Sequence, residues 1–169
     1  PKENFQIIES ARKSLEDSAR ISAYLKDAKK ISIDANGNLS VEHRTEQPPP
    51  AAMVKFFNRL MTEIYAIDRE AKVKIIEIIK VKKGERRTPY AHFDSGPSLQ
   101  ILTTFRGQRS WMQGADGAFF QVPELGDSVL FLTKGAEYPT AHLSPMDFDS
   151  DRILLRIQVE SPLFAKKSN

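Results

Sequence analysis

The chain contains no cysteine in its 169 residues. That absence excludes disulfide bonds, thiolate metal sites and cysteine nucleophiles, so any metal site must use histidine, aspartate, glutamate and water. Histidine is scarce, with three residues, and no apolar run approaches the ~18 residues of a membrane-spanning helix. The sequence also lacks a glycine-rich phosphate loop, an HExxH zinc helix and a GxSxG nucleophile elbow.

The composition is otherwise ordinary for a globular protein, with 40% hydrophobic and 28% charged residues. A chain of this length predicts a single domain over residues 1–169. The net charge of +3 is mildly basic, but basic and acidic residues are interleaved, so nucleic-acid contact is permitted without being indicated. Residues 1–13 lack a basic-then-apolar leader, and we therefore expect no membrane association and a cytoplasmic location.

Residues 1–70 are predicted to be a mainly helical segment. Apolar residues recur at helical spacing over residues 4–29, at Phe5, Ile8, Leu15, Ile21 and Leu25. Alternation around Asn36-Gly37, a pair that favours a type I′ turn, predicts a β-hairpin over residues 31–42. Three prolines at 48–50 precede a second expected helix, whose apolar stripe is Met53, Phe56, Phe57, Leu60, Ile64 and Ile67.

From residue 71 onward the pattern changes to short apolar runs separated by Gly, Pro and Asp. We expect strands over residues 73–82, 99–106, 119–122, 128–133 and 152–160. Such a series is typical of a sandwich, barrel or jelly roll. The sequence therefore predicts an α+β fold in which residues 1–70 buttress a β-rich, metal-binding part over residues 71–169.

His92-Phe93-Asp94 together with His142 is the pattern that suggests metal chemistry. On an extended strand the side chains of His92 and Asp94 point the same way, so both can reach one ion. His142 follows Asp94 by 48 residues, which allows the chain to return on a neighbouring strand and supply a third ligand. Two imidazoles and one carboxylate suit non-haem Fe(II) and leave coordination positions open.

The alternative is that these are unrelated polar residues on loops, since Pro89, Pro97 and Pro145 lie nearby. The remaining histidine, His43, lies among charged residues, and we expect it at the surface. A Ser/His/Asp catalytic triad is disfavoured, because no serine lies in a nucleophile-elbow context.

Arg152 and Arg156 are four residues apart on a predicted strand and therefore share one face. An arginine fork binds a carboxylate through two parallel hydrogen bonds, so either is a candidate anchor for a dicarboxylate co-substrate. We favour Arg152, which lies nearer to His142 in sequence. In a plain sandwich both arginines would instead face solvent. Tyr90, just before the motif, is either a further ligand-binding residue or a half-buried strand residue.

The order of these residues resembles that of the Fe(II)/2-oxoglutarate-dependent dioxygenase superfamily, where an HxD motif precedes a distal histidine and then an arginine. The resemblance implies a double-stranded β-helix, or jelly roll, with supporting N-terminal helices. It implies Fe(II) held by His92, Asp94 and His142, and 2-oxoglutarate bound by Arg152. Residues 90–159 are also similar to the uncharacterised bacterial family known as domain of unknown function 1826, through HFD, LQILTTFRGQRSWM, GDSVLFLTKG and AHLSP…RILLRI.

The leading hypothesis is thus a hydroxylase-type oxygenase that acts on an unidentified small-molecule or protein substrate. One alternative is a non-catalytic jelly-roll module whose motif is vestigial or binds metal structurally. The other is a cupin-like metal enzyme that does not use 2-oxoglutarate. Iron-dependent succinate formation distinguishes the oxygenase from the non-catalytic module, and a requirement for Arg152 distinguishes it from the cupin-like enzyme.

Overall fold

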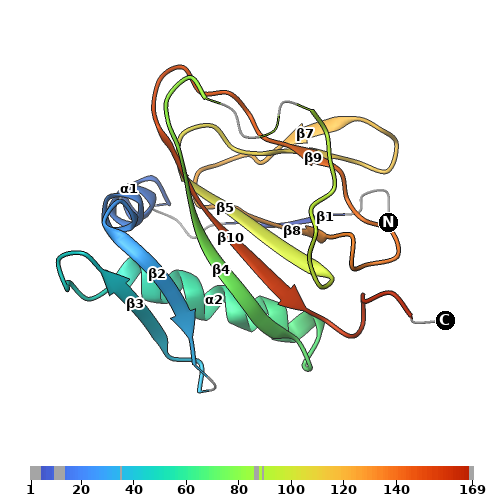
Figure 1. Ribbon diagram of the computed structural model, residues 1–169, viewed down its shortest axis with the longest axis horizontal. Helices are drawn as coiled ribbons and strands as arrows, with labels where there is room; N and C mark the ends of the chain where they lie inside the picture. The colour runs from blue at the N-terminus through green and yellow to red at the C-terminus, as the bar shows by residue number, and fades with distance from the viewer. Residues whose placement is uncertain (1–4, 10–13, 35, 86–87, 89, 168–169) are drawn as a thin grey trace.

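The computed structural model describes residues 5–9, 14–34, 36–85, 88 and 90–167 (Figure 1). This part of the chain contains the helices α1 (Ser14–Leu25) and α2 (Ala51–Ile67). Its strands are β1 (Phe5–Ile8), β2 (Ala28–Ile33), β3 (Leu39–His43), β4 (Lys72–Val81), β5 (Leu99–Arg106), β6 (Trp111–Gln113), β7 (Phe119–Gln121), β8 (Ser128–Leu132), β9 (His142–Leu143) and β10 (Arg152–Glu160). The named strands pair antiparallel. The expected combination of helices and a β-rich part is confirmed.

The strands form three sheets. The largest has five strands in the order β1-β8-β5-β10-β4, a second has three in the order β7-β6-β9, and β2 pairs with β3. An isolated bridge between His92 and His142 adds the His92 segment beside β9. From β4 to β10 the chain passes repeatedly between the five-stranded and three-stranded sheets, so segments distant in sequence become neighbours (Figure 1).

One face of the five-stranded sheet, here called the outer face, is covered by the helices (Figure 1). The stripe expected on α2 is the buried one, with Met53, Phe57, Leu60 and Ile64 packed into the core. Alternate residues of β10 meet it, because side chains of a strand point to opposite faces in turn; they are Ile153, Leu155, Ile157 and Val159. Within the described residues, neither helix has the length and apolar character needed to cross a membrane.

The opposite, inner face of the five-stranded sheet forms a second apolar core with the three-stranded sheet. Its buried members include Leu102, Met112, Phe131 and Leu154. The period of two along β10 places Arg152, Arg156 and Gln158 on the same face as Leu154. The arginines therefore do not point to the solvent-facing side of a plain sandwich; they lie between the layers.

The prediction of a helix over residues 4–29 is wrong at both ends of that range. Residues 5–8 form strand β1, which pairs with β8, and α1 begins only at Ser14. Phe5 and Ile7 pack toward the inner core whereas Ile8 packs toward the helices, which is the alternation of a strand. At the other end Ala28 already belongs to β2. Residue 4 and residues 10–13 of the expected helix lie outside the described residues.

The hairpin expected over residues 31–42 is confirmed as β2 and β3, and the type expected for its turn involves residue 35, which lies outside the described residues. His43 is buried rather than exposed. Its ring stacks on Tyr24 at 4.2 Å between centroids, and its Nε2 lies 3.0 Å from the Tyr24 carbonyl oxygen.

Candidate metal centre

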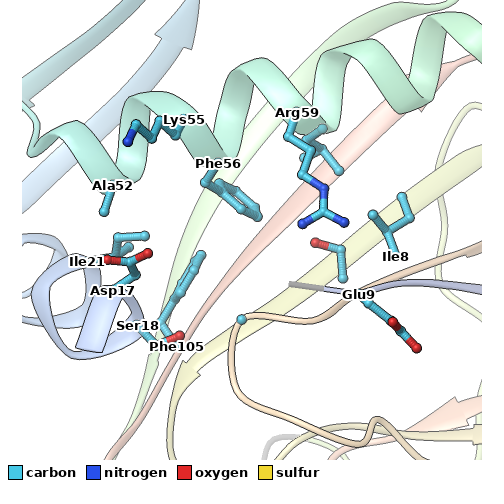
Figure 2. Close-up of a pocket in the computed structure, with 13 residues that line it drawn as sticks. Ile8, Glu9, Asp17, Ser18, Ile21, Ala52, Lys55, Phe56, Arg59 and Phe105 are labelled. Atoms are coloured by element: carbon cyan, nitrogen blue, oxygen red, sulfur yellow. The ribbon is translucent and has the colours of Figure 1, made fainter. Parts of the chain in front are cut away.

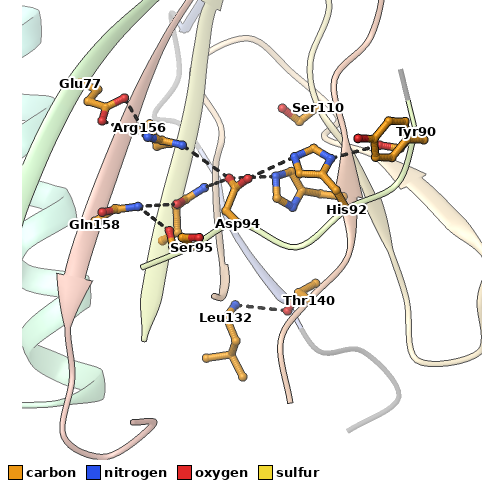
Figure 3. A network of polar contacts seen from close by, with 12 residues as sticks. Glu77, Tyr90, His92, Asp94, Ser95, Ser110, Leu132, Thr140, Arg156 and Gln158 are labelled. Carbon is orange, nitrogen blue, oxygen red and sulfur yellow. Dashed lines mark hydrogen bonds and ion pairs between the residues drawn. The ribbon is translucent and has the colours of Figure 1, made fainter. Parts of the chain in front are cut away.

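His92, Asp94 and His142 meet at one point between the two larger sheets. Figure 3 shows the side chains of His92 and Asp94 pointing toward one another. One potential ligand atom from each residue lies within 4.8 Å of the others. His92 Nε2 is 3.1 Å from Asp94 Oδ1, and His142 Nε2 is 3.1 Å from Asp94 Oδ2. Their spacing makes them a candidate metal-binding group, as the sequence predicts.

The backbone holds these side chains in place. His92 and His142 exchange two hydrogen bonds, from His92 N to His142 O at 2.9 Å and from His142 N to His92 O at 3.0 Å. The two imidazoles therefore project side by side, with ring centroids 4.3 Å apart. The carbonyl oxygen of Asp94 accepts a hydrogen bond from Lys134 N at 2.9 Å, which ties the loop before β5 to the end of β8.

The tautomer of His92 follows from its second ring nitrogen. Nδ1 lies 3.1 Å from the carbonyl oxygen of Tyr90, which can only accept a hydrogen bond, so Nδ1 carries the proton of the neutral ring. Nε2 then presents a lone pair to the Asp94 carboxylate. Two electron-pair donors at this separation repel unless a proton or a cation lies between them. The geometry is therefore suited to a positive ion.

His142 and Asp94 are the more enclosed pair. His142 Nδ1 is buried and has no hydrogen-bond partner among the described residues, so without a cation the proton of its neutral ring lies on Nε2 and is donated to Asp94. Burial alone would raise the pKa of Asp94. The hydrogen bond and electrostatic interaction with His142, the hydrogen bond from Gln100 and the electrostatic interaction with His92 outweigh burial and hold that pKa below its ordinary value. The carboxylate is thus kept ionised, as a metal ligand must be.

Polar side chains from the inner face of the sheet surround Asp94 (Figure 3). Gln100 Nε2 donates to Asp94 Oδ2 at 2.5 Å, and Arg156 Nη1 lies 3.8 Å from the same oxygen. Arg156 Nη2 also donates to both carboxylate oxygens of Glu77, each at 2.9 Å. Gln158 Nε2 in turn donates to Gln100 Oε1 at 3.2 Å.

The two arginines have different surroundings. Arg152 is 3% exposed and donates to two neutral groups, the Gln108 carbonyl oxygen at 2.8 Å and Ser110 Oγ at 2.7 Å. No carboxylate among the described residues forms an ion pair with it. Burial lowers the pKa of Arg152 to about 10, against the opposing charge of Asp147. Arg156, by contrast, is paired with acidic groups and partly exposed.

Tyr90 contributes through its backbone, since its carbonyl oxygen fixes His92 while its side chain is largely exposed. Sequence reasoning missed Glu77, Gln100 and Gln158. A signal for the two glutamines was present, because each is a polar residue within an otherwise apolar strand. Their contact with one another depends on the register of β5 against β10, which pairs Gln158 with Gln100.

A separate cavity of about 130 Å³ lies on the other side of the five-stranded sheet, between the sheet and both helices (Figure 2). Phe56 and Phe105 form part of its apolar lining, and the Arg59 guanidinium points toward it. None of its lining residues belongs to the His92, Asp94 and His142 group. The sheet therefore separates this cavity from the candidate metal centre.

Comparison with solved structures finds chains of the same fold. AviO1 from Streptomyces viridochromogenes Tue57 has a TM-score of 0.60 and 11% identity, over 99% of this chain and 94% of that one. A viral collagen prolyl hydroxylase from Paramecium Bursaria Chlorella virus-1, solved as a 2-oxoglutarate complex, has a TM-score of 0.56 and 10% identity, over 97% of each chain. An oxidoreductase of the 2-oxoglutarate-Fe(II) oxygenase family from Burkholderia pseudomallei has a TM-score of 0.56 and 11% identity, over 92% and 84%.

No protein-family model and no curated protein sequence matches the chain. The similarity to the domain of unknown function 1826 therefore has no support beyond the segments quoted above. At 10–11% identity the likeness to the solved structures establishes a shared fold, and the chemistry has to be argued from this chain's own residues.

Proposed function

We propose that this protein is an Fe(II)- and 2-oxoglutarate-dependent oxygenase with His92, Asp94 and His142 as its iron ligands. The observation that carries the proposal is the convergence of two imidazole nitrogens and one carboxylate within 4.8 Å. The fold shared with a prolyl hydroxylase–2-oxoglutarate complex and with a member of the 2-oxoglutarate-Fe(II) oxygenase family supports it.

The finer architecture we propose is a double-stranded β-helix. Its eight segments would be β4, the His92 segment, β5, β6, β7, β8, β9 and β10. Along the chain these segments are shared between two facing sheets, as a double-stranded β-helix requires. β4, β5, β8 and β10 lie in one sheet, and the others lie in the second. In such a fold a ligand site lies between the sheets, where this group of side chains lies.

The donor set fits Fe(II). Histidine nitrogens and a carboxylate suit that ion, and three protein ligands leave positions open for a co-substrate and oxygen. The lone pairs that His92 and Asp94 direct at one another provide a site that a cation would satisfy. When bound, iron supplies the oxygen-activating redox chemistry that no side chain of this cysteine-free protein offers.

Arg152 is the residue we assign to the far carboxylate of 2-oxoglutarate. A buried guanidinium that forms no ion pair with a carboxylate among the described residues is unfavourable, and an incoming carboxylate would relieve that cost through charge-assisted hydrogen bonds. Arg156 is less suited, because its Nη2 already donates to both carboxylate oxygens of Glu77. Its distance of 3.8 Å from Asp94 instead supports a role in neutralising the ligand carboxylate.

The chain's residues also control access to the centre. The side chain of His142 is 4% exposed, whereas those of His92 and Asp94 are 19% and 16% exposed. Substrate would therefore approach from the side of His92 and Asp94. The apolar residues between the sheets, such as Met112 and Phe131, would keep water from the other side, where it would compete with substrate oxidation.

Anaerobic titration with Fe(II) and then 2-oxoglutarate tests the proposal, because the loaded centre should give a weak visible charge-transfer band. Admission of oxygen should then produce succinate. The matched control is His92→Ala, which removes a ligand from a partly exposed position and should abolish both signals in a folded protein.

Three results are informative. Absence of Fe(II) binding by the unaltered protein would refute the metal centre. Binding of Fe(II) without any response to 2-oxoglutarate, in both unaltered and Arg152→Lys protein, would favour a cupin-like centre. Binding of both Fe(II) and 2-oxoglutarate, without oxygen consumption in the presence of any tested substrate, would favour a non-catalytic module.

A further inference from the structure

The two oxygens of Asp94 have different environments. Oδ2 accepts from Gln100 at 2.5 Å, contacts His142 Nε2 at 3.1 Å and lies 3.8 Å from Arg156. Among the described residues, the single hydrogen-bond or ion-pair partner of Oδ1 is His92. Oδ1 is therefore the oxygen that the rest of the protein leaves open to a cation.

Of the two flipped orientations of the Gln100 side-chain amide, the hydrogen bonds around it allow one. Ser95 contributes a backbone carbonyl oxygen, which must accept, so the atom of Gln158 that lies 2.8 Å from it is the Nε2 donor. The same Nε2 has a second hydrogen, which it gives to Gln100 Oε1 at 3.2 Å. Gln100 must then present its own Nε2 to Asp94.

Burial makes this orientation strict. Gln100 is 0% exposed and Gln158 is 7% exposed, so water offers little alternative to the protein partners. A reversed Gln100 amide would set its carbonyl oxygen against the Asp94 carboxylate and its NH₂ against the Gln158 NH₂. Both contacts would be repulsive and would leave buried polar atoms unsatisfied.

We propose that Gln100, oriented by Gln158, is a positioning residue that holds Oδ2 of Asp94 so that Asp94 coordinates the metal through Oδ1 alone. The inference rests on the proposed metal centre and extends it beyond its three ligands. A carboxylate free to turn would chelate through both oxygens and take up a coordination position. The held carboxylate leaves that position open for the co-substrate.

The competing explanation is purely structural. In that case the two glutamines satisfy one another across paired strands, and Asp94 is simply the last acceptor in this series of hydrogen bonds. The two explanations differ in how the variants combine. Under the positioning role Gln158 affects the metal only through Gln100, whereas under the structural role the effects of the two substitutions are independent.

The experiment is a double-mutant cycle read by metal affinity, with Co(II) as the probe and the full chain as the sample. Gln100→Met keeps the size of the side chain and removes the donor, and it should weaken Co(II) binding about 10–100-fold. Gln158→Met should weaken it about 3–10-fold, since Gln100 then loses its orientation. The double variant should bind Co(II) as Gln100→Met does.

Gln113→Met is the matched control, because the Gln113 amide donates to the Gly117 carbonyl oxygen rather than to Asp94, and the substitution should leave Co(II) affinity unchanged. Thermal unfolding without metal checks that each variant is folded. Where Gln100→Met does not fold, Gln100→Glu serves in its place, since it keeps the shape and sets an acceptor against Asp94.

Equal loss of affinity from Gln158→Met in both backgrounds overturns the proposal and leaves the metal centre intact. So does unchanged Co(II) affinity in folded Gln100→Met. Failure of the unaltered protein to bind Co(II) or Fe(II) overturns the proposed function together with this inference.

Discussion

Replacing Gly135 with alanine should damage both the fold and the candidate metal centre. A methyl group on Gly135 would lie 2.0 Å from the carbonyl oxygen of Pro97 and 2.3 Å from that of Gly96. Both atoms belong to the backbone just after Asp94, so no side-chain rotation relieves the overlap. The adjacent Lys134 N also donates to the carbonyl oxygen of Asp94 at 2.9 Å. Any shift that accommodates the methyl group therefore moves the ligand.

The size of the effect follows from these distances. Contacts of a methyl carbon closer than 3.0 Å are essentially absent from real structures, so the 2.0 Å contact requires a displacement of at least 1.0 Å. Overpacking that side chains can absorb costs about 1–3 kcal/mol, and a backbone displacement belongs at the upper end, near 3 kcal/mol. For a chain of this length each kcal/mol lowers Tm by about 2–4 °C. We therefore expect a fall of roughly 6–12 °C.

The measurement pairs thermal unfolding with Co(II) titration. Gly114→Ala is the control, because its nearest neighbours are a flexible Asp116 side-chain oxygen at 3.2 Å and the Ala118 carbonyl oxygen at 3.6 Å. That variant should unfold within about 2 °C of the unaltered protein and bind Co(II) normally. A Gly135→Ala protein with the same Tm and Co(II) affinity as Gly114→Ala would refute the argument that this close approach fixes Asp94.

Three further perturbations have expected outcomes. In the unaltered protein Co(II) at 100 times its Kd should add about 2.7 kcal/mol of stability, and His142→Ala should abolish that gain in a thermal shift assay. Arg152→Lys should weaken 2-oxoglutarate binding about tenfold or more in calorimetry while sparing Co(II), and equal loss in Arg156→Lys would contradict the assignment. For Asp147, burial raises the pKa, but backbone hydrogen bonds outweigh it and hold the pKa below its ordinary value. Its contribution is therefore present above about pH 4 and lost as pH falls through the lowered pKa, so urea midpoints of Asp147→Asn and unaltered protein should converge in acid.

The sequence predicts those elements whose signal is local. The bounds of β5 and β10 match the expected strands, since both are apolar runs with clear breaks on either side. The stripe of α2 likewise predicts which face is buried. Residues 5–8 mislead, because their apolar spacing fits a helix and the strand they form depends on β8, far along the chain.

The same distinction applies to the candidate site. His92, Asp94 and His142 are recognisable by residue type and order, and the structure brings them together. Gln100 and Gln158 gain a role only through the register that pairs them. The burial of His43 is equally non-local, since it depends on stacking against Tyr24 from α1.

The backbone bridge between His92 and His142 has a consequence for how the centre would acquire its ion. Bringing together two groups 50 residues apart costs about 3.5 kcal/mol of loop-closure entropy. Here the folded backbone already holds the two histidines together before any ion binds, because they exchange two backbone hydrogen bonds. Folding therefore offsets this entropy cost, and metal binding does not have to. Folding and metal uptake are then separate events, unlike those of a zinc finger. The ion should therefore be removable by a chelator and exchangeable for another without unfolding the protein.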